Sequence, residues 1–152
     1  MYPFVLTLHS WLRWIALLAG LLTTATLLGG HGGGEKPGRS ELLGLVCMIA
    51  LDVQMLLGLI LYFGLSPNTA PILADFGAAM RDPVARFWAV EHLTTMLVAV
   101  LLAHAGRVLG RRAAAGPGRR MRMMTCFGLA TLLMIIFIPW PGMSAGRPLF
   151  RL

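Results

Sequence analysis

The sequence predicts an all-α fold, an antiparallel four-helix bundle integral to a membrane. Of its 152 residues, 57% are hydrophobic and only 12% are charged. The mean hydropathy of +0.76 lies well outside the range of soluble domains. Four apolar runs, separated by clusters of Gly, Pro and Arg, approach the roughly 20 residues that a helix needs to cross a bilayer. We expect a single domain, 1–152, with helices at about 4–28, 41–64, 84–109 and 121–138.

Local signals support each run in turn. The run 4–28 has no basic segment before it and exceeds the apolar length of a signal peptide, so we expect a membrane helix there. The run 41–64 is apolar except for a few polar residues near its middle. The third run follows Asp82 and Pro83, which are typical of an N-cap and a first-turn proline. The fourth run lies between an arginine-rich loop and the segment "IPWP".

The positions of the basic residues predict the orientation of the bundle. The loops after the first and third runs hold most of them: Lys36, Arg39, Arg107, Arg111, Arg112, Arg119, Arg120 and Arg122. Short basic loops stay in the cytoplasm, so we expect a multi-pass protein of the bacterial inner membrane with both termini periplasmic. The net charge of +7 then reflects topology and attraction to anionic lipids of the bilayer. No aromatic residues interleave the arginine loop, which argues against nucleic-acid binding.

In this orientation every Trp and Tyr falls in the periplasmic half: Tyr2, Trp11, Trp14, Tyr62, Trp88 and Trp140. An interfacial belt explains Tyr62 and Trp140, whereas Trp11 and Trp14 lie deeper than an anchor requires. We therefore treat Trp11, Trp14 and Trp88 as candidates for lining a space between helices.

Four ionisable residues share this half. At about 1.5 Å per helical residue, His9, Arg13, Glu91 and His92 lie at similar depths. Such groups are rare in membranes and mark either structural pairs or functional sites. We expect Arg13 to pair with Glu91, or to bind a haem propionate through its forked donors. His9 and His92 would then be available to ligate the iron of a b-type haem between helices.

Other interpretations of these residues stay open. The two histidines could be hydrogen-bonding residues of helix packing, or could serve quinone binding or proton transfer. Asp52, near the middle of the second run, is a candidate for proton handling together with Glu91, or a neutral hydrogen-bonded acid. His104 and His31 are expected to be interfacial and solvated residues. Cys47 and Cys126 form no metal or c-type haem motif.

Several segments resemble a family of small four-helix bacterial membrane proteins, mostly uncharacterised and sometimes labelled cytochrome b-like. They are "LHSWLRW", "QMLLGLILYF", "AAMRDPVARFWAVEHL" and "IPWP", which occur in this order over most of the chain. The resemblance implies that His9, Arg13, Arg86, Glu91 and His92 belong to the family pattern. Some relatives have His where this chain has Asp52, so a third ligand is not implied for this chain.

The combined prediction is a membrane b-type cytochrome that binds haem b through His9 and His92 and transfers electrons, with quinone as a candidate partner. It would be an electron-transfer or accessory subunit rather than a stand-alone enzyme. The alternative is a cofactor-free subunit that packs against a larger respiratory or photosynthetic complex or forms a homo-oligomer. Small residues in the helices support that alternative: Gly20, Gly44, Gly58, Ala99, Ala103, Gly106 and Gly128.

Overall fold

The computed structural model describes residues 1–31, 34 and 38–150, and every regular element in this part of the chain is helical. Four helical spans are long and apolar enough to cross a membrane: Tyr2–Leu28, Arg39–Leu65, Pro83–Arg112 and Pro117–Phe137. The predicted all-helical fold of a multi-pass membrane protein is confirmed to this extent. The observed spans begin one to four residues earlier than predicted, and the second and fourth include charged residues in their first turns. Lys36 lies outside the described residues.

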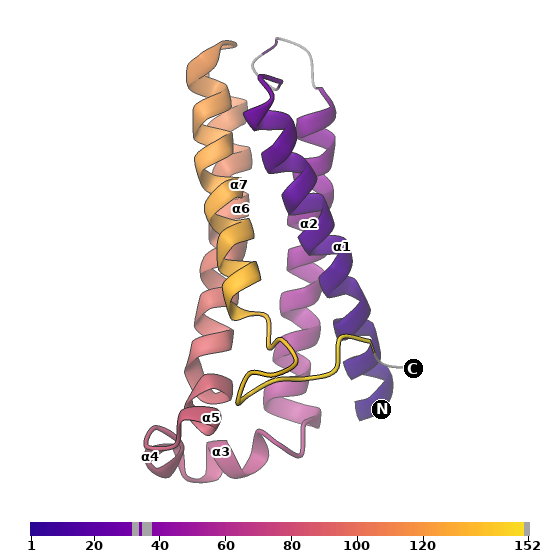
Figure 1. Ribbon diagram of the computed structural model, residues 1–152, viewed down its shortest axis with the longest axis vertical. Helices are drawn as coiled ribbons and strands as arrows, with labels where there is room; N and C mark the ends of the chain where they lie inside the picture. The colour runs from indigo at the N-terminus through magenta and orange to yellow at the C-terminus, as the bar shows by residue number, and fades with distance from the viewer. Residues whose placement is uncertain (32–33, 35–37, 151–152) are drawn as a thin grey trace.

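Two of the spans change their helical geometry near one end. The first and last are the continuous α-helices α1 (Tyr2–Leu28) and α7 (Pro117–Phe137). The second is α2 (Arg39–Ile60) followed by a π-helical turn, η1 (Leu61–Leu65). The third consists of α5 (Pro83–Arg86), a second π-helical turn η2 (Phe87–Glu91), and α6 (His92–Arg112). Both π-helical turns lie at the same end of the bundle (Figure 1).

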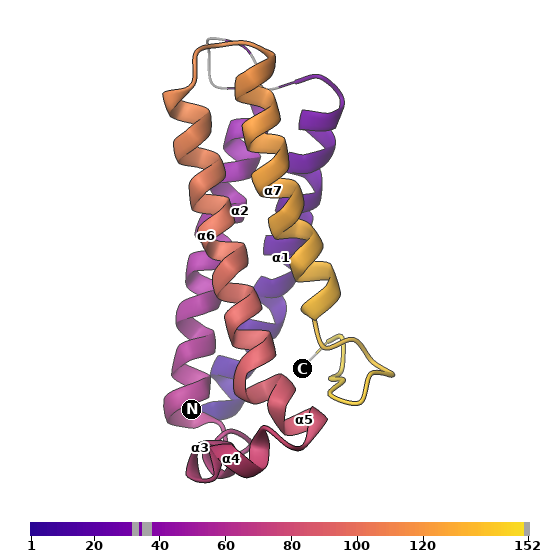
Figure 2. The same cartoon turned by 90° about the vertical axis from the view of Figure 1, so that its left-hand side faces the viewer.

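The four spans lie side by side, and consecutive spans run in opposite directions (Figures 1 and 2). Around the bundle α1 contacts α2 and α7, and α6 contacts the same two helices. The short helices α3 (Ala70–Ala74) and α4 (Phe76–Ala79) connect the second span to the third below the π-helical turns. The Asp82 carboxylate accepts a hydrogen bond from the Ala85 N–H at 2.7 Å, so the predicted N-cap of the third span is confirmed.

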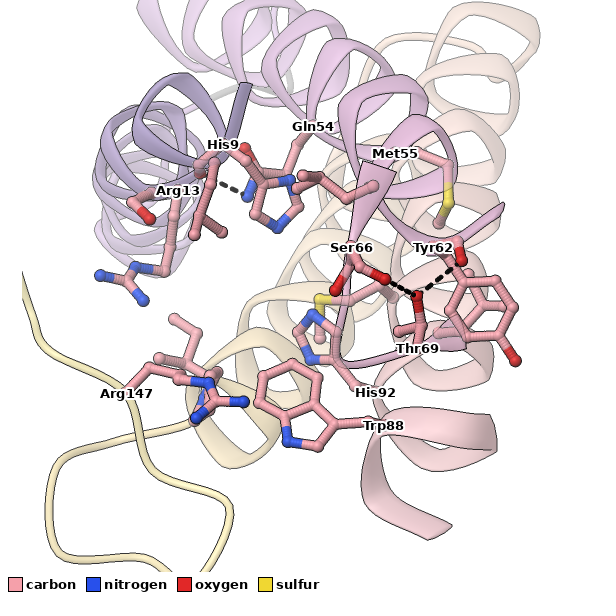
Figure 3. Close-up of a pocket in the computed structure, with 18 of the residues that line it drawn as sticks. His9, Arg13, Gln54, Met55, Tyr62, Ser66, Thr69, Trp88, His92 and Arg147 are labelled. Carbon is pink, nitrogen blue, oxygen red and sulfur yellow. Dashed lines mark hydrogen bonds between the residues drawn. The ribbon is translucent and has the colours of Figure 1, made fainter. Parts of the chain in front are cut away.

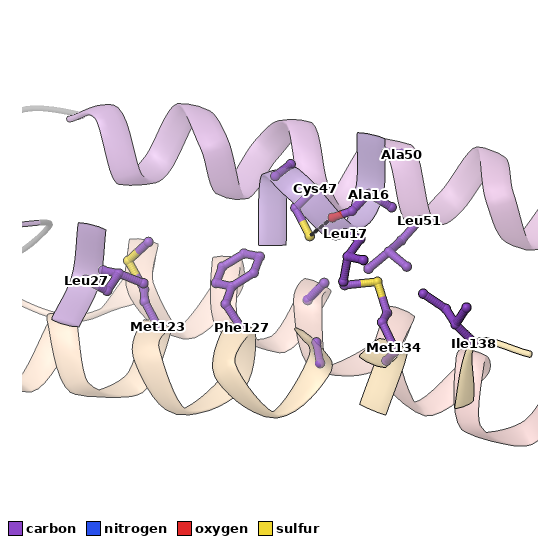
Figure 4. Packing of buried hydrophobic residues seen from close by; sticks show 14 residues of the cluster. Ala16, Leu17, Leu27, Cys47, Ala50, Leu51, Met123, Phe127, Met134 and Ile138 are labelled. Atoms are coloured by element: carbon purple, nitrogen blue, oxygen red, sulfur yellow. Dashed lines mark hydrogen bonds between the residues drawn. The ribbon is translucent and has the colours of Figure 1, made fainter. Parts of the chain in front are cut away.

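Close packing fills the half of the bundle that lies toward the arginine-rich loop, away from the π-helical turns. Phe127 of α7 is fully buried at its centre (Figure 4). A Cβ added to Gly44 would lie 2.9 Å from the Phe127 ring, and one added to Gly106 would lie 2.8 Å from Cys126. The glycines therefore let α2 and α6 approach α7 closely, the usual means of helix association in membranes. Cys47 is buried in the same core, as expected of an apolar thiol.

An ion pair links the start of α7 to the start of α2 beyond this core. Arg119, at the start of α7, donates to the carboxylate of Glu41, at the start of α2. Arg107 donates to the backbone carbonyl of Glu41 at 3.2 Å. Both side chains of the Arg119–Glu41 pair are nearly buried, so some of the arginines that indicated topology also hold the bundle together.

Residues 138–150 return across the opposite end of the bundle (Figure 1). The Leu149 carbonyl accepts hydrogen bonds from the Arg13 guanidinium at 2.6 Å and from the Trp14 indole at 3.2 Å. The Phe150 ring stacks on Trp14 at a centroid distance of 5.6 Å. We call residues 138–150 the C-terminal strap, since they tie the end of the chain to α1.

Candidate functional site

A cavity of about 290 Å³ lies between the helices in the half that the C-terminal strap crosses (Figure 3). This volume is close to the lower end of the range for small-molecule sites. All four spans and the strap contribute to its walls. Its polar lining includes His9, Ser10, Arg13, Gln54, Tyr62, Trp88, His92 and Arg147. Of the four residues expected at similar depths, His9, Arg13 and His92 line this cavity, whereas Glu91 is not among its described lining residues.

His92 enters the cavity from the first residue of α6. Its Nδ1 lies 3.0 Å from the backbone carbonyl oxygen of Phe137. A carbonyl oxygen can only accept, so Nδ1 carries the hydrogen and Nε2 keeps the lone pair of the neutral ring. Metal-ligating histidines are commonly oriented by such a bond from their second nitrogen. The rings of Phe87 and Trp88 lie 5.7 and 5.6 Å from the imidazole and restrict its orientation.

His9 enters the same cavity from α1. Gln54 of α2 donates to the His9 backbone carbonyl at 2.8 Å, which fixes α1 against α2 at this level. A Cβ at Gly58 would lie 3.3 Å from Cε1 of His9, so the glycine leaves room for the ring beside α2. The buried Nδ1 of His9 has no hydrogen-bond partner among the described residues. Buried polar atoms are normally paired, so this nitrogen is available to a ligand.

The two π-helical turns shape the cavity end of the second and third spans. In η2 the His92 N–H donates to the Phe87 carbonyl, five residues back instead of four. In η1 the Ser66 N–H similarly donates to the Leu61 carbonyl at 2.9 Å. The Tyr62 hydroxyl joins the two turns by donating to the Ala89 carbonyl at 2.7 Å. Such turns are frequent at functional sites because they redirect side chains within a helix.

Two arginines lie at one side of the cavity, on α1 and on the C-terminal strap (Figure 3). The Arg147 guanidinium lies over the Trp88 ring, 5.0 Å from its centroid, and the Arg13 guanidinium lies 5.1 Å from that of Trp14. Both arginines line the cavity. Their positive charge at this wall suits a ligand with carboxylate groups.

The prediction that Arg13 pairs with Glu91 is wrong. The Glu91 carboxylate accepts from Nε of Arg86 at 2.7 Å, and both side chains are more than a third exposed. Arg13 instead donates to the strap carbonyl of Leu149. Arg86 and Glu91 are five residues apart, which matches the spacing of a π-helical turn.

Two further candidates lie beside the cavity rather than in its described lining. Trp14 packs against the buried core and against Trp140 at a centroid distance of 6.1 Å. Trp11 contacts Phe150 at 5.5 Å and is 45% exposed. These tryptophans therefore hold the C-terminal strap. Sequence reasoning missed Arg147 of the strap, because it follows the last apolar run and carries no helical periodicity.

Asp52 and His104 form a pair that the sequence did not predict. Nε2 of His104 on α6 lies 2.8 Å from the Asp52 carboxylate on α2. Neither residue lines the cavity as the structure describes it. His104 is therefore not the separate interfacial residue that the sequence suggested.

The donor set at the cavity suits a haem better than a metal ion held by protein alone. The described residues contain no group of three or more His, Cys, Asp or Glu side chains placed to hold a metal ion. A haem iron needs only axial ligands from the protein, and two imidazoles are a usual set. His9 and His92 offer such imidazoles, and His9 Nδ1, Gln54 Oε1 and Trp88 Nε1 are buried polar atoms without partners in the described structure. The residues present thus fit this group.

Comparison with known proteins identifies no relative: no family model matches the chain, and neither curated proteins nor solved structures show significant similarity to it.

Proposed function

We propose that the protein is a membrane b-type cytochrome that binds haem b in its cavity and takes part in electron transfer. One observation carries this proposal: imidazoles from α1 and α6 line the same cavity, and the Phe137 carbonyl fixes Nδ1 of His92 so that Nε2 is free to ligate. Bound haem would supply one-electron chemistry, while the protein supplies ligation and electrostatics.

The remaining polar residues have roles that follow from their positions. Arg13 and Arg147 would bind the propionates from α1 and the strap, because both guanidinium groups line one wall of the cavity. Trp88, against the His92 ring, would limit movement of that ligand. The strap residues Pro139 and Pro148 also line the cavity and would limit access of water.

The membrane setting of the proposal follows from the charge distribution. The cavity is lined by residues nearer one end of the bundle, and the loop between α6 and α7 and the start of α2 at Arg39 lie at the other end (Figure 1). By the positive-inside rule this end would face the cytoplasm of a bacterial cell, so the cavity and both termini would lie on the periplasmic side. A quinol in the bilayer and a periplasmic acceptor are the electron-transfer partners that such a position favours.

Internal packing weakens the case for a cofactor-free accessory subunit. That case relied on small residues available for contact with other chains. Gly20, Gly44, Ala99, Ala103 and Gly106 are instead buried within this chain. Their small size is already used in packing the bundle itself.

A reduced-minus-oxidised visible spectrum of the purified, haem-supplied protein tests the proposal. We expect a b-type band in the wild type and its loss or displacement in His9→Ala and His92→Ala. His31→Ala, at an exposed position outside the cavity, is the matched control and should keep the band. Circular dichroism reports whether each variant remains helical, and imidazole added to His92→Gly should restore the band. A wild type without a haem band, or His9 and His92 variants with unchanged spectra, would overturn the proposal.

A further inference from the structure

Asp52 and His104 form a polar pair between two of the membrane-spanning helices. Asp52 lies at the midpoint of the 27-residue span Arg39–Leu65, and its carboxylate is 2.8 Å from Nε2 of His104. The pair bridges α2 and α6, which are neighbours in the bundle.

This pair faces outward rather than into the bundle. The side chains of His104 and Asp52 are 45% and 41% exposed. Large apolar residues one turn away on both helices are also exposed: Ile49, Leu56, Leu101 and Val108. The pair is therefore a polar spot on an apolar surface that lipid tails would contact.

Such a location is costly for ionisable side chains. Ionisable groups in membranes almost always face the protein interior or a water-filled space, because lipid offers no hydrogen bonds. Hydrogen bonding between Asp52 and His104 satisfies only part of their capacity, since the carboxylate has a second oxygen and the imidazole a second nitrogen. A molecule that reaches the pair from the bilayer and hydrogen-bonds to it would meet the remaining requirement.

We propose that Asp52 and His104 bind the head group of a quinone or quinol that enters sideways from the bilayer. The hydroxyl groups of a quinol can donate to the second Asp52 oxygen or to Nδ1 of His104, and a quinone carbonyl can accept from Nδ1 when that nitrogen carries hydrogen. Its isoprenoid tail would lie along the exposed apolar residues of α2 and α6. A second copy of the chain fits less well, because these neighbouring positions carry large side chains rather than the small ones that let helices approach.

The pair also lies close to the cavity. Leu51 precedes Asp52 in sequence, Val100 lies one helical turn from His104, and both line the cavity. The pair and the cavity thus involve the same segments of α2 and α6. Use of the quinol as an electron donor rests on the proposed haem function, whereas quinone binding itself does not.

Quinone binding by the purified full-length protein in lipid nanodiscs tests the inference. The probes are decylubiquinone and a short-chain menaquinone, titrated with correction for partition into empty nanodiscs. We expect saturable binding, and Asp52→Leu/His104→Leu should raise the dissociation constant about tenfold or more, as expected from loss of charge-assisted hydrogen bonds. Replacing both partners by apolar side chains should leave folding intact, since no unpaired polar group remains. Thr94→Leu removes another exposed hydroxyl of α6 and should bind as the wild type does.

The haem spectrum and the molecular mass in nanodiscs separate the possible results. Tenfold weaker quinone binding with an unchanged haem band supports both proposals. The same loss in a protein that never shows a haem band supports the quinone site and overturns the cytochrome. Unchanged quinone binding in the double variant overturns the quinone site. The quinone site is also overturned if the wild type is a dimer without saturable quinone binding and the double variant is a monomer. The pair would then be a contact between subunits.

Discussion

The two halves of the bundle use their interior in opposite ways. We call the half around Phe127 the closed half and the half around His9 and His92 the open half. In the closed half, glycines bring backbones so near the Phe127 ring that an added Cβ would collide. In the open half, the helices surround a cavity of about 290 Å³ lined by polar side chains such as His9, Gln54 and His92. We infer that the closed half supplies stability, and we propose the open half as the binding site.

The largest expected effect is the loss of packing in the closed half. Phe127→Ala should lower the free energy of unfolding by about 3 kcal/mol, because the dispersion contacts of a fully buried ring are lost. Met96→Ala in the open half should cost clearly less, since Met96 already borders the cavity. Unfolding of both variants in detergent mixtures, followed by circular dichroism, measures the difference. Equal losses would remove the distinction between the halves.

Glycine substitutions should separate stability from ligand binding. Gly44→Ala places a Cβ 2.9 Å from the Phe127 ring, so we expect destabilisation by about 1–3 kcal/mol and an unchanged haem spectrum. Gly58→Ala places a Cβ 3.3 Å from Cε1 of His9, so a small shift of the ring should alter the spectrum at little cost in stability. Thermal unfolding and visible spectra of the same samples test this pair. A reversed pattern would contradict it.

The smallest effect is expected at the rim of the open half. Glu91→Gln removes the charge partner of Arg86, but both side chains are more than a third exposed. Such pairs contribute about 0–1 kcal/mol after solvent screening. We expect a shift in thermal unfolding within that range and no change in the haem spectrum, with His31→Gln as a reference substitution at an exposed position. Loss of the haem band in Glu91→Gln would show that the carboxylate acts on the site.

The sequence predicted the parts of this structure that depend on local pattern. Apolar runs of bilayer length predicted the four spans, and counting residues along them placed His9 and His92 at similar depths. Side-chain contacts that depend on the rotation of one helix relative to another, or on segments outside the helices, were not predicted. The pairing of Asp52 with His104 requires the rotation of α2 relative to α6. The position of Arg147 depends on a strap with no repeating pattern. The partner of Glu91 was missed because similar depth alone does not show which side chains meet, and the nearby Arg86 takes its carboxylate.

The π-helical turn η2 has a further consequence for the third span. A π-helical turn contains about one residue more than an α-helical turn, so it changes the phase of the helix by about 100°. The residues that α5 and α6 present to one side of the span are therefore offset by one position from a regular α-helical repeat. A single-residue deletion in η2 would convert it into an ordinary α-helical turn, so α5 and α6 would keep the faces they now present while the side chains of η2 itself lost their redirected positions. The hydrogen bond from Tyr62 to the Ala89 carbonyl marks the point in the span where the extra residue is accommodated.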